Sequence, residues 1–125
     1  MPTLAANTRL VVVSIRTNRL LETVHFYRDV VGLAGLAHHG QQPAFDLGNG
    51  AFLVIVESQQ MPEQPATQPR FPLLAFAVED VDAAAARLKE LQVQMPWGIE
   101  SNSQNRWIEF YDPGGNLIEF AQFSA

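Results

Sequence analysis

The sequence predicts an α+β fold in which two βαβββ modules pair around a cleft. A strand pattern, a helix pattern and about three further strand patterns occur twice along the chain. One offset places Val12 of the first copy on Leu73 of the second, and Leu20 on Val81. Each copy alone would leave one face of its sheet bare, so we expect the two copies to pack together.

The first module is expected to cover about residues 8–57. Its opening strand is Arg9–Ile15, RLVVVSI, a run rich in β-branched residues. Apolar residues at helical spacing then predict a helix that Thr17 or Asn18 caps and that Gly32 ends. Three short strands are expected to follow, at Gly35–His39, Ala44–Leu47 and Ala51–Val56.

Residues 58–72, SQQMPEQPATQPRFP, are expected to link the modules. This segment holds four prolines and four glutamines and has almost no apolar periodicity, which is typical of an extended linker. At about 3.1 Å per residue such a segment spans roughly 45 Å. That length permits the modules to pair within one chain or between two chains.

The second module is expected to cover about residues 73–123. Its opening strand is Leu73–Val78, LLAFAV. Asp80 or Asp82 is predicted to cap a helix that reaches Leu91. A connecting stretch and a closing hairpin complete the module.

The closing hairpin, Arg106–Gln122, is the most informative part of the chain. Proline, glycine and asparagine predict a tight turn at Asp112–Asn116, because they fix φ or tolerate a positive φ. If Tyr111 pairs with Leu117, strand alternation makes one face apolar, with Ile108, Phe110, Ile118 and Phe120. The opposite face then carries Trp107, Glu109, Tyr111 and Glu119. We predict that these four residues bind a ligand on the wall of a groove.

Each of the four residues also has a simpler interpretation. Glu119 is either a groove carboxylate that binds a cationic or hydroxylated ligand or acts as a general base, or an ion-paired or solvated residue without such a role. Glu109 opposite Glu119 would raise one pKa or require a cation between them, unless it is a rim residue without a role. Trp107 could stack on a planar or cationic ligand or fill a contact between modules or subunits. Tyr111 could donate a hydrogen bond to a ligand or simply form the wall.

Two motifs resemble the vicinal oxygen chelate superfamily, which includes glyoxalase I, bleomycin-resistance proteins and extradiol dioxygenases. Residues 25–33, HFYRDVVGL, resemble the end of that family's first helix, and residues 112–120, DPGGNLIEF, resemble its closing hairpin. Residues 77–81, AVEDV, are similar to the family's entry into the second helix. The resemblance covers nearly the whole chain and implies the paired-module fold. It does not specify the chemistry, because the fold serves lyases, isomerases, transferases, oxygenases and binding proteins.

The resemblance also implies four positions for the ligands of a divalent metal. They correspond here to Val12, about Leu53, Leu73 and Glu119. Valine and leucine cannot bind a metal, and one carboxylate is a poor site for a transition metal. We therefore expect no metal and no other cofactor, although a divalent metal at Glu119 is the alternative.

Composition narrows the possible functions. The chain has 47% hydrophobic residues, no cysteine and a net charge of −5. An acidic chain without a basic cluster does not favour nucleic-acid binding, and its apolar runs are too short to cross a membrane. The N-terminal sequence MPTLAANTRL lacks the pattern of a secretory signal, so we expect a cytoplasmic protein.

The leading hypothesis is a small-molecule-binding protein that sequesters or binds a cationic or aromatic ligand without metal, as bleomycin-resistance proteins do. Its main rival is a glyoxalase-like lyase or isomerase, or a dioxygenase-like enzyme, with a divalent metal at Glu119. A third possibility is a structural or regulatory dimer whose own side chains fill the cleft. Small members of the superfamily often build the cleft between chains, so a homodimer is expected.

Overall fold

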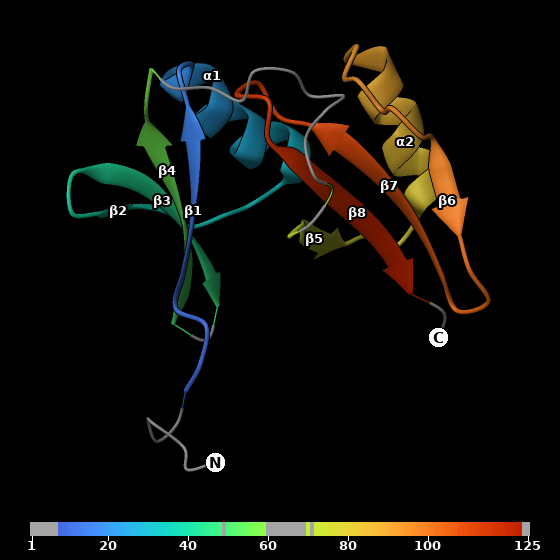
Figure 1. Cartoon of the computed structure of the whole chain (residues 1–125), viewed down its shortest axis with the longest axis horizontal. Helices are drawn as coiled ribbons and strands as arrows, with labels where there is room; N and C mark the ends of the chain where they lie inside the picture. Colours follow the sequence, from blue (N-terminus) through green and yellow to red (C-terminus); the bar gives the residue numbers. More distant parts are fainter. Residues whose placement is uncertain (1–7, 49, 60–69, 71, 124–125) are drawn as a thin grey trace.

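The computed structural model describes residues 8–48, 50–59, 70 and 72–123. Two four-stranded sheets of mixed direction form the protein, with strand orders β1-β4-β3-β2 and β5-β8-β7-β6 (Figure 1). The first sheet contains β1 (Val12–Thr17), β2 (Leu36–His39), β3 (Gln42–Gly48) and β4 (Ala51–Glu57). The second contains β5 (Leu74–Ala77), β6 (Ile99–Ser101), β7 (Asn105–Tyr111) and β8 (Leu117–Phe123). The predicted α+β fold of two βαβββ modules is confirmed.

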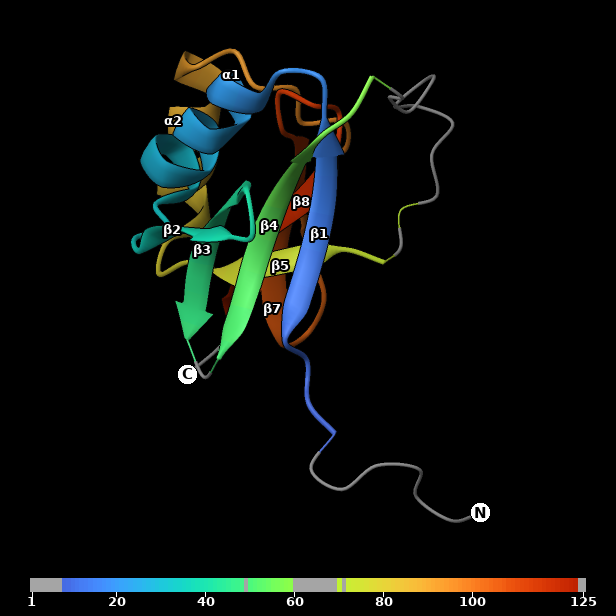
Figure 2. The same ribbon diagram turned by 90° about the vertical axis from the view of Figure 1, so that its left-hand side faces the viewer.

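Both modules follow the same path. The first strand of each pairs in parallel with the last, β1 with β4 and β5 with β8, and the remaining pairs are antiparallel. Figure 2 shows the first sheet in front of the second, with both helices along one side of the view. Within the described part of the chain, no helix is both long and apolar enough to cross a membrane.

The first helix starts later than the sequence predicts. Helix α1 covers Leu20–His25, with Arg19 at the N-cap and no side-chain capping bond, so the prediction that Thr17 or Asn18 caps it is wrong. The reason is that Thr17 is the buried last residue of β1. Its Oγ1 accepts a 2.9 Å hydrogen bond from the Arg19 N–H and lies 2.9 Å from Thr23 Oγ1.

The helix continues as a π-helical turn, η1 (Phe26–Val31), which ends at Gly32 as predicted. Gly32 has φ +88°, a conformation that glycine adopts without steric cost. The rings of Phe26 and Tyr27 are both buried and meet edge to face at 5.8 Å. Phe26 also packs against Phe110 of the second module, with ring centroids 6.1 Å apart.

The second helix, α2, covers Val81–Glu90 and has the predicted cap at Asp80. The Asp80 carboxylate accepts a 3.1 Å hydrogen bond from the Ala83 N–H. Helix α2 packs on β6, β7 and β8. Most of the predicted linker, residues 60–69 and 71, lies outside the described residues.

Buried apolar side chains from both modules form one core. From the second module the core includes the predicted apolar face of the hairpin, Ile108, Phe110, Ile118 and Phe120. The halves therefore pack together within one chain.

A buried polar cluster also joins the modules. We call it the Asp112 cluster; it consists of Tyr27, Asp112, Gly114 and Asn116. The Tyr27 hydroxyl donates a 2.7 Å hydrogen bond to Asp112 Oδ2, and Asn116 Nδ2 donates a 2.8 Å bond to the Arg16 carbonyl. A Cβ on Gly114 would lie 2.7 Å from Thr17 Cβ, so glycine permits this close approach.

Candidate functional site

Strand β7 pairs with β8 in the register that the sequence predicts. Tyr111 pairs with Leu117, and Glu109 lies directly opposite Glu119. Alternation along both strands places Trp107, Glu109 and Glu119 on the face opposite the apolar core. Strand alternation assigns Tyr111 to the same face. Tyr111 is the last residue of β7, and it borders a second hollow whose lining also includes Arg19.

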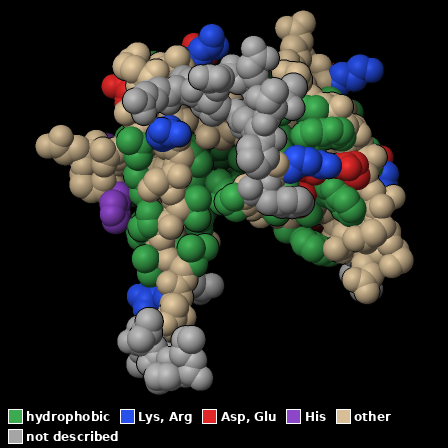
Figure 3. All heavy atoms as spheres, viewed as in Figure 1, with side chains coloured by type: hydrophobic (Ala, Val, Ile, Leu, Met, Phe, Trp, Pro, Cys, Tyr) green, Lys and Arg blue, Asp and Glu red, His purple; other side chains and the backbone are tan. Residues whose placement is uncertain are grey.

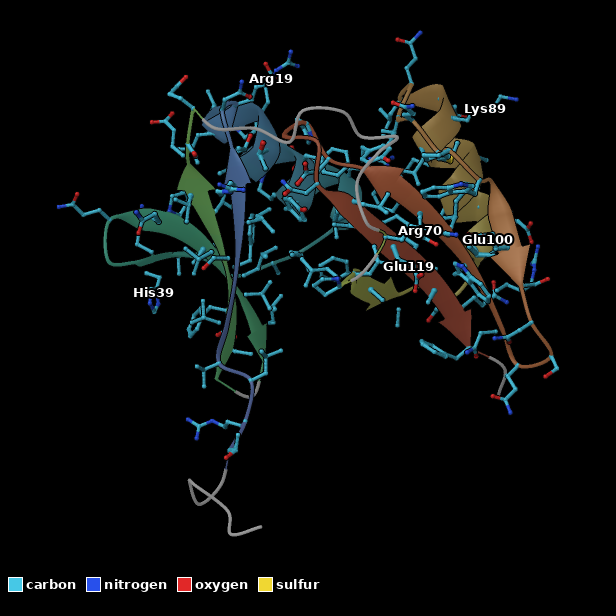
Figure 4. All side chains as sticks on the ribbon, in the orientation of Figure 1. Arg19, His39, Arg70, Lys89, Glu100 and Glu119 are labelled. Atoms are coloured by element: carbon cyan, nitrogen blue, oxygen red, sulfur yellow. The ribbon has the colours of Figure 1, made fainter. Side chains whose placement is uncertain are left out.

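Arg70 reaches this face from the region that the sequence assigns to a linker. Its Nε donates a 3.1 Å hydrogen bond to Glu109 Oε1, and one terminal nitrogen donates to Glu109 Oε2. The same nitrogen donates a 2.6 Å bond to Glu100 Oε1. Figure 4 shows Arg70, Glu100 and Glu119 near one another over the second sheet. Local sequence patterns carried no signal for this contact.

Two tryptophans complete the surroundings of Arg70. The guanidinium carbon lies 3.9 Å from the centroid of the Trp97 ring, at the distance of a cation–π contact. Trp107 Nε1 donates a 3.2 Å hydrogen bond to Glu100 Oε1. We call the group the Arg70 cluster; it consists of Arg70, Trp97, Glu100, Trp107 and Glu109. Figure 3 shows basic and acidic side chains side by side here, next to hydrophobic ones.

Burial differs across the Arg70 cluster. The Glu109 side chain is only 2% exposed, whereas that of Arg70 is 33% exposed. Removing a carboxylate from water is costly unless a partner compensates its charge, and the bidentate pair with Arg70 supplies that partner. The prediction that Glu109 faces Glu119 is confirmed, and the cation that pairs with Glu109 is Arg70 of the same chain.

Glu119 lies beside the cluster but accepts no hydrogen bond from the described residues. Burial raises the pKa of Glu119, and the negative charges of Glu109 and Glu100 raise it further, while Arg70 lowers it. Among the described residues, Glu100, Glu109 and Glu119 thus share this face with the Arg70 guanidinium. When all three carboxylates are ionised, they carry more negative charge than Arg70 neutralises.

A hollow of about 520 Å³ lies where the two modules meet. Its walls come from β1, from the start of β5 and from the start of β8, and they are mainly apolar. Val12 and Leu73 line the hollow, whereas Trp107, Glu109, Tyr111 and Glu119 do not. The predicted binding residues therefore lie on the second sheet beside the hollow, with Glu109 and Tyr111 buried and Trp107 and Glu119 partly exposed.

Arg106 and the three histidines take no part in the Arg70 cluster as the structure describes it. Arg106, near the start of β7, forms an ion pair and donates to the Asp82 carboxylate at 2.7 and 3.0 Å. His25 and His38 are exposed, and His39 is an exposed residue whose ring lies 6.3 Å from that of Phe52.

A match to a known protein family identifies the superfamily of this chain. The profile of the Glyoxalase/Bleomycin resistance protein/Dioxygenase superfamily matches residues 9–120, which is nearly the whole chain. The chain belongs to this superfamily. No curated protein matches the sequence significantly.

Solved structures of the superfamily share the fold. A glyoxalase/dioxygenase from Nostoc punctiforme superposes with a TM-score of 0.76 at 17% identity, covering 100% of this chain and 99% of that one. TnmS3, an antibiotic-binding protein from a Streptomyces species, gives 0.67 at 26% identity, covering 96% and 99%. A lactoylglutathione lyase from Agrobacterium tumefaciens gives 0.66 at 21% identity, covering 94% of each chain.

The superfamily's metal chemistry does not fit the side chains of this chain. The offset that places Val12 on Leu73 also places Ser14 on Ala75. Ser14 pairs with Val54 in the first sheet, and Ala75 pairs with Glu119 in the second, so Val54 is the counterpart of Glu119. The sequence predicts this counterpart at about Leu53, but Leu53 belongs to the core and is fully buried. The correction leaves the donor set unchanged, because valine is also no ligand. One carboxylate among valine and leucine side chains is a poor site for a divalent transition metal.

Proposed function

We propose that this chain is a small-molecule-binding protein that works without metal and holds a cationic or aromatic ligand. The ligand would lie on the face of the second sheet that carries Trp107, Glu109, Tyr111 and Glu119. The main support is the position of Glu119, a carboxylate that accepts no hydrogen bond within the described residues and lies beside two further carboxylates. A ligand cation would gain a charge-assisted hydrogen bond there.

Aromatic side chains give the same face a preference for planar ligands. Trp97 already stacks on one planar cation, the Arg70 guanidinium. Trp97 is 42% exposed, so part of it remains in contact with solvent. A ligand that combines a flat ring with a positive charge matches both properties.

Among the similar structures, TnmS3 is described as an antibiotic-binding protein, which is consistent with this proposal. The lactoylglutathione lyase represents the enzymatic alternative, which would place a divalent metal at Glu119. The donor set described above favours binding over metal-dependent catalysis.

The proposal can be tested with purified protein. We expect benzamidinium, a planar aromatic cation, to raise the melting temperature, and we expect Glu119→Gln to weaken its binding by about 1–3 kcal/mol. The control is Glu90→Gln, which removes an exposed carboxylate on α2 and should leave binding unchanged. Equal affinity of the Glu119→Gln variant and the wild type would contradict the role of Glu119.

Metal analysis separates the two functional classes. We expect well under one equivalent of zinc, nickel, iron or manganese after purification without chelators. One equivalent that Glu119→Gln removes would support the enzymatic alternative.

We also propose that the protein is a homodimer. The hollow between the modules is apolar and open to its surroundings, and a second copy would cover it. Sedimentation at micromolar concentration should give twice the monomer mass of 13.9 kDa. A monomer at that concentration would contradict the proposal.

A further inference from the structure

The position suited to a planar cation is already filled by a side chain of the same protein. The Arg70 guanidinium stacks on Trp97 and donates to two carboxylates, those of Glu109 and Glu100. This combination of an aromatic face and a bidentate carboxylate is the usual way in which proteins recognise guanidinium and amidinium groups. The contacts that hold Arg70 are therefore those that a ligand of this class would use.

Burial indicates which partner is fixed and which is exchangeable. Glu109 is almost completely buried in the middle of β7, so it requires a cation whenever it is ionised. Arg70 is one-third exposed, and rotation of its long side chain would place the guanidinium in water. The carboxylate belongs to the sheet, whereas the cation can come from the chain or from a ligand.

We propose that Arg70 is an internal occupant of the cation position and that a guanidinium or amidinium ligand competes with it. This inference rests on the proposed function, because it assumes that ligands bind to this face. A ligand then binds only to molecules whose Arg70 side chain has left, which lowers its apparent affinity by that fraction. Arg70 thereby sets specificity, because a ligand must replace a flat, delocalised cation. A compact ammonium cannot stack on the ring in the same way or donate the same pair of hydrogen bonds.

Intrinsic fluorescence gives a direct measurement. The chain has two tryptophans, and both belong to the Arg70 cluster. Arg70→Ala empties the cation position, and methylguanidinium chloride is the probe that should refill it. We expect saturable changes in tryptophan fluorescence and melting temperature, with affinity at least about tenfold higher in Arg70→Ala than in the wild type.

Three controls define the chemistry of the site. Methylammonium chloride at the same ionic strength should have little effect on Arg70→Ala, because methylammonium lacks a planar group that donates two parallel hydrogen bonds. Arg28→Ala removes an exposed arginine that pairs with Asp29 on the first helix, and it should titrate like the wild type. Adding Glu109→Gln to Arg70→Ala should abolish the methylguanidinium response.

The proposal is overturned if Arg70→Ala and the wild type bind methylguanidinium equally, or if methylammonium works as well. If Arg70→Ala does not fold, Arg70→Lys retains a positive charge for Glu109 without the planar group. Its methylguanidinium affinity should exceed that of the wild type, and equal affinity would overturn the proposal.

The outcome also separates this inference from the proposed function. Benzamidinium binding that depends on Glu119 but does not improve in Arg70→Ala would reject the role of Arg70 and keep the function. Refilling of Arg70→Ala by methylguanidinium, with no benzamidinium binding to the wild type, would keep the cation position and reject the function.

Discussion

Two carboxylates of the same hairpin, Asp112 and Glu119, have opposite surroundings. Asp112 accepts hydrogen bonds from the Tyr27 hydroxyl, from the N–H groups of Gly114 and Asn116 and from the Asn116 side chain. Glu119 accepts none from the described residues. Burial is the first cause that raises the pKa of each group, so the direction of the shift does not distinguish them. Their hydrogen bonds do distinguish them: the Asp112 oxygens are bonded to the Tyr27 hydroxyl and to the turn, which stabilises the fold, whereas the Glu119 oxygens have no such partner among the described residues.

The two modules show the same contrast on a larger scale. On the face of the first sheet opposite the core residues Leu53 and Phe45, neighbouring positions hold Ser14, Val54 and Ala44, of which Val54 and Ala44 are buried. The corresponding positions in the second sheet hold Ala75, Glu119 and Glu109. The strand pairing is the same, but only the second row carries charge. The fold is repeated and the candidate chemistry is not.

The largest expected effect is the loss of the Asp112 carboxylate. Asp112→Ala leaves the Tyr27 hydroxyl and the N–H groups of the turn without acceptors, and we expect a loss of about 3 kcal/mol in the free energy of unfolding. Urea unfolding measures this. Asp112→Asn keeps the shape and one acceptor oxygen, so it should cost clearly less. Equal losses would mean that the charge, rather than the hydrogen bonds, stabilises this cluster.

Gly114→Ala should have the next largest effect. The added Cβ would meet Thr17 Cβ and Oγ1 at 2.7 Å and the Arg16 carbonyl at 3.0 Å. We expect a loss of about 1–3 kcal/mol, because the modules must move apart at this contact. Gly115→Asn is the control in the same turn: Gly115 has φ +85° with open space around its Cβ position, and asparagine tolerates this conformation. A larger loss for Gly115→Asn would contradict the contact argument.

Tyr27→Phe should have a smaller effect. It removes one of several donors to Asp112 and leaves the buried ring in place, so we expect a loss of about 1 kcal/mol. Thermal unfolding of the single variant, of Asp112→Asn and of the double variant would measure the coupling. Additive losses would show that the two groups do not stabilise one another.

Glu119→Gln should change stability least. Glu119 faces Glu109, and removing this like-charge pair should increase the free energy of unfolding by less than about 1 kcal/mol after solvent screening. Folding raises the pKa of Glu119 above 4.5, so the carboxyl loses its proton less readily in the folded protein than in the unfolded chain. The free energy of unfolding of the wild type therefore decreases as the pH rises from 4.5 through the raised pKa. The advantage of the variant should therefore be present at neutral pH and disappear below about pH 4, where the wild-type carboxyl is protonated in both states. Unfolding curves at several pH values test this, and a large loss of stability at neutral pH would show that Glu119 is a structural ion-pair partner.

Local chemistry allowed much of the hairpin to be predicted. The turn residues and the period of two together determined which residues face the core and which face outward, because both depend on neighbours in the sequence. The N-cap of the first helix was mispredicted because Thr17, a suitable capping residue, is used by β1 and by Thr23.

The sequence by itself determined the paired-module fold, the register of β7 with β8 and the position of Glu109 opposite Glu119. Only the tertiary structure showed that Arg70 pairs with Glu109, 39 residues along the chain, and that Tyr27 donates to Asp112, 85 residues away. Hydrogen bonds between such distant residues depend on how the modules and the segment that links them pack together. A periodic pattern specifies the face on which a side chain lies, but the charge that approaches that face comes from elsewhere in the chain.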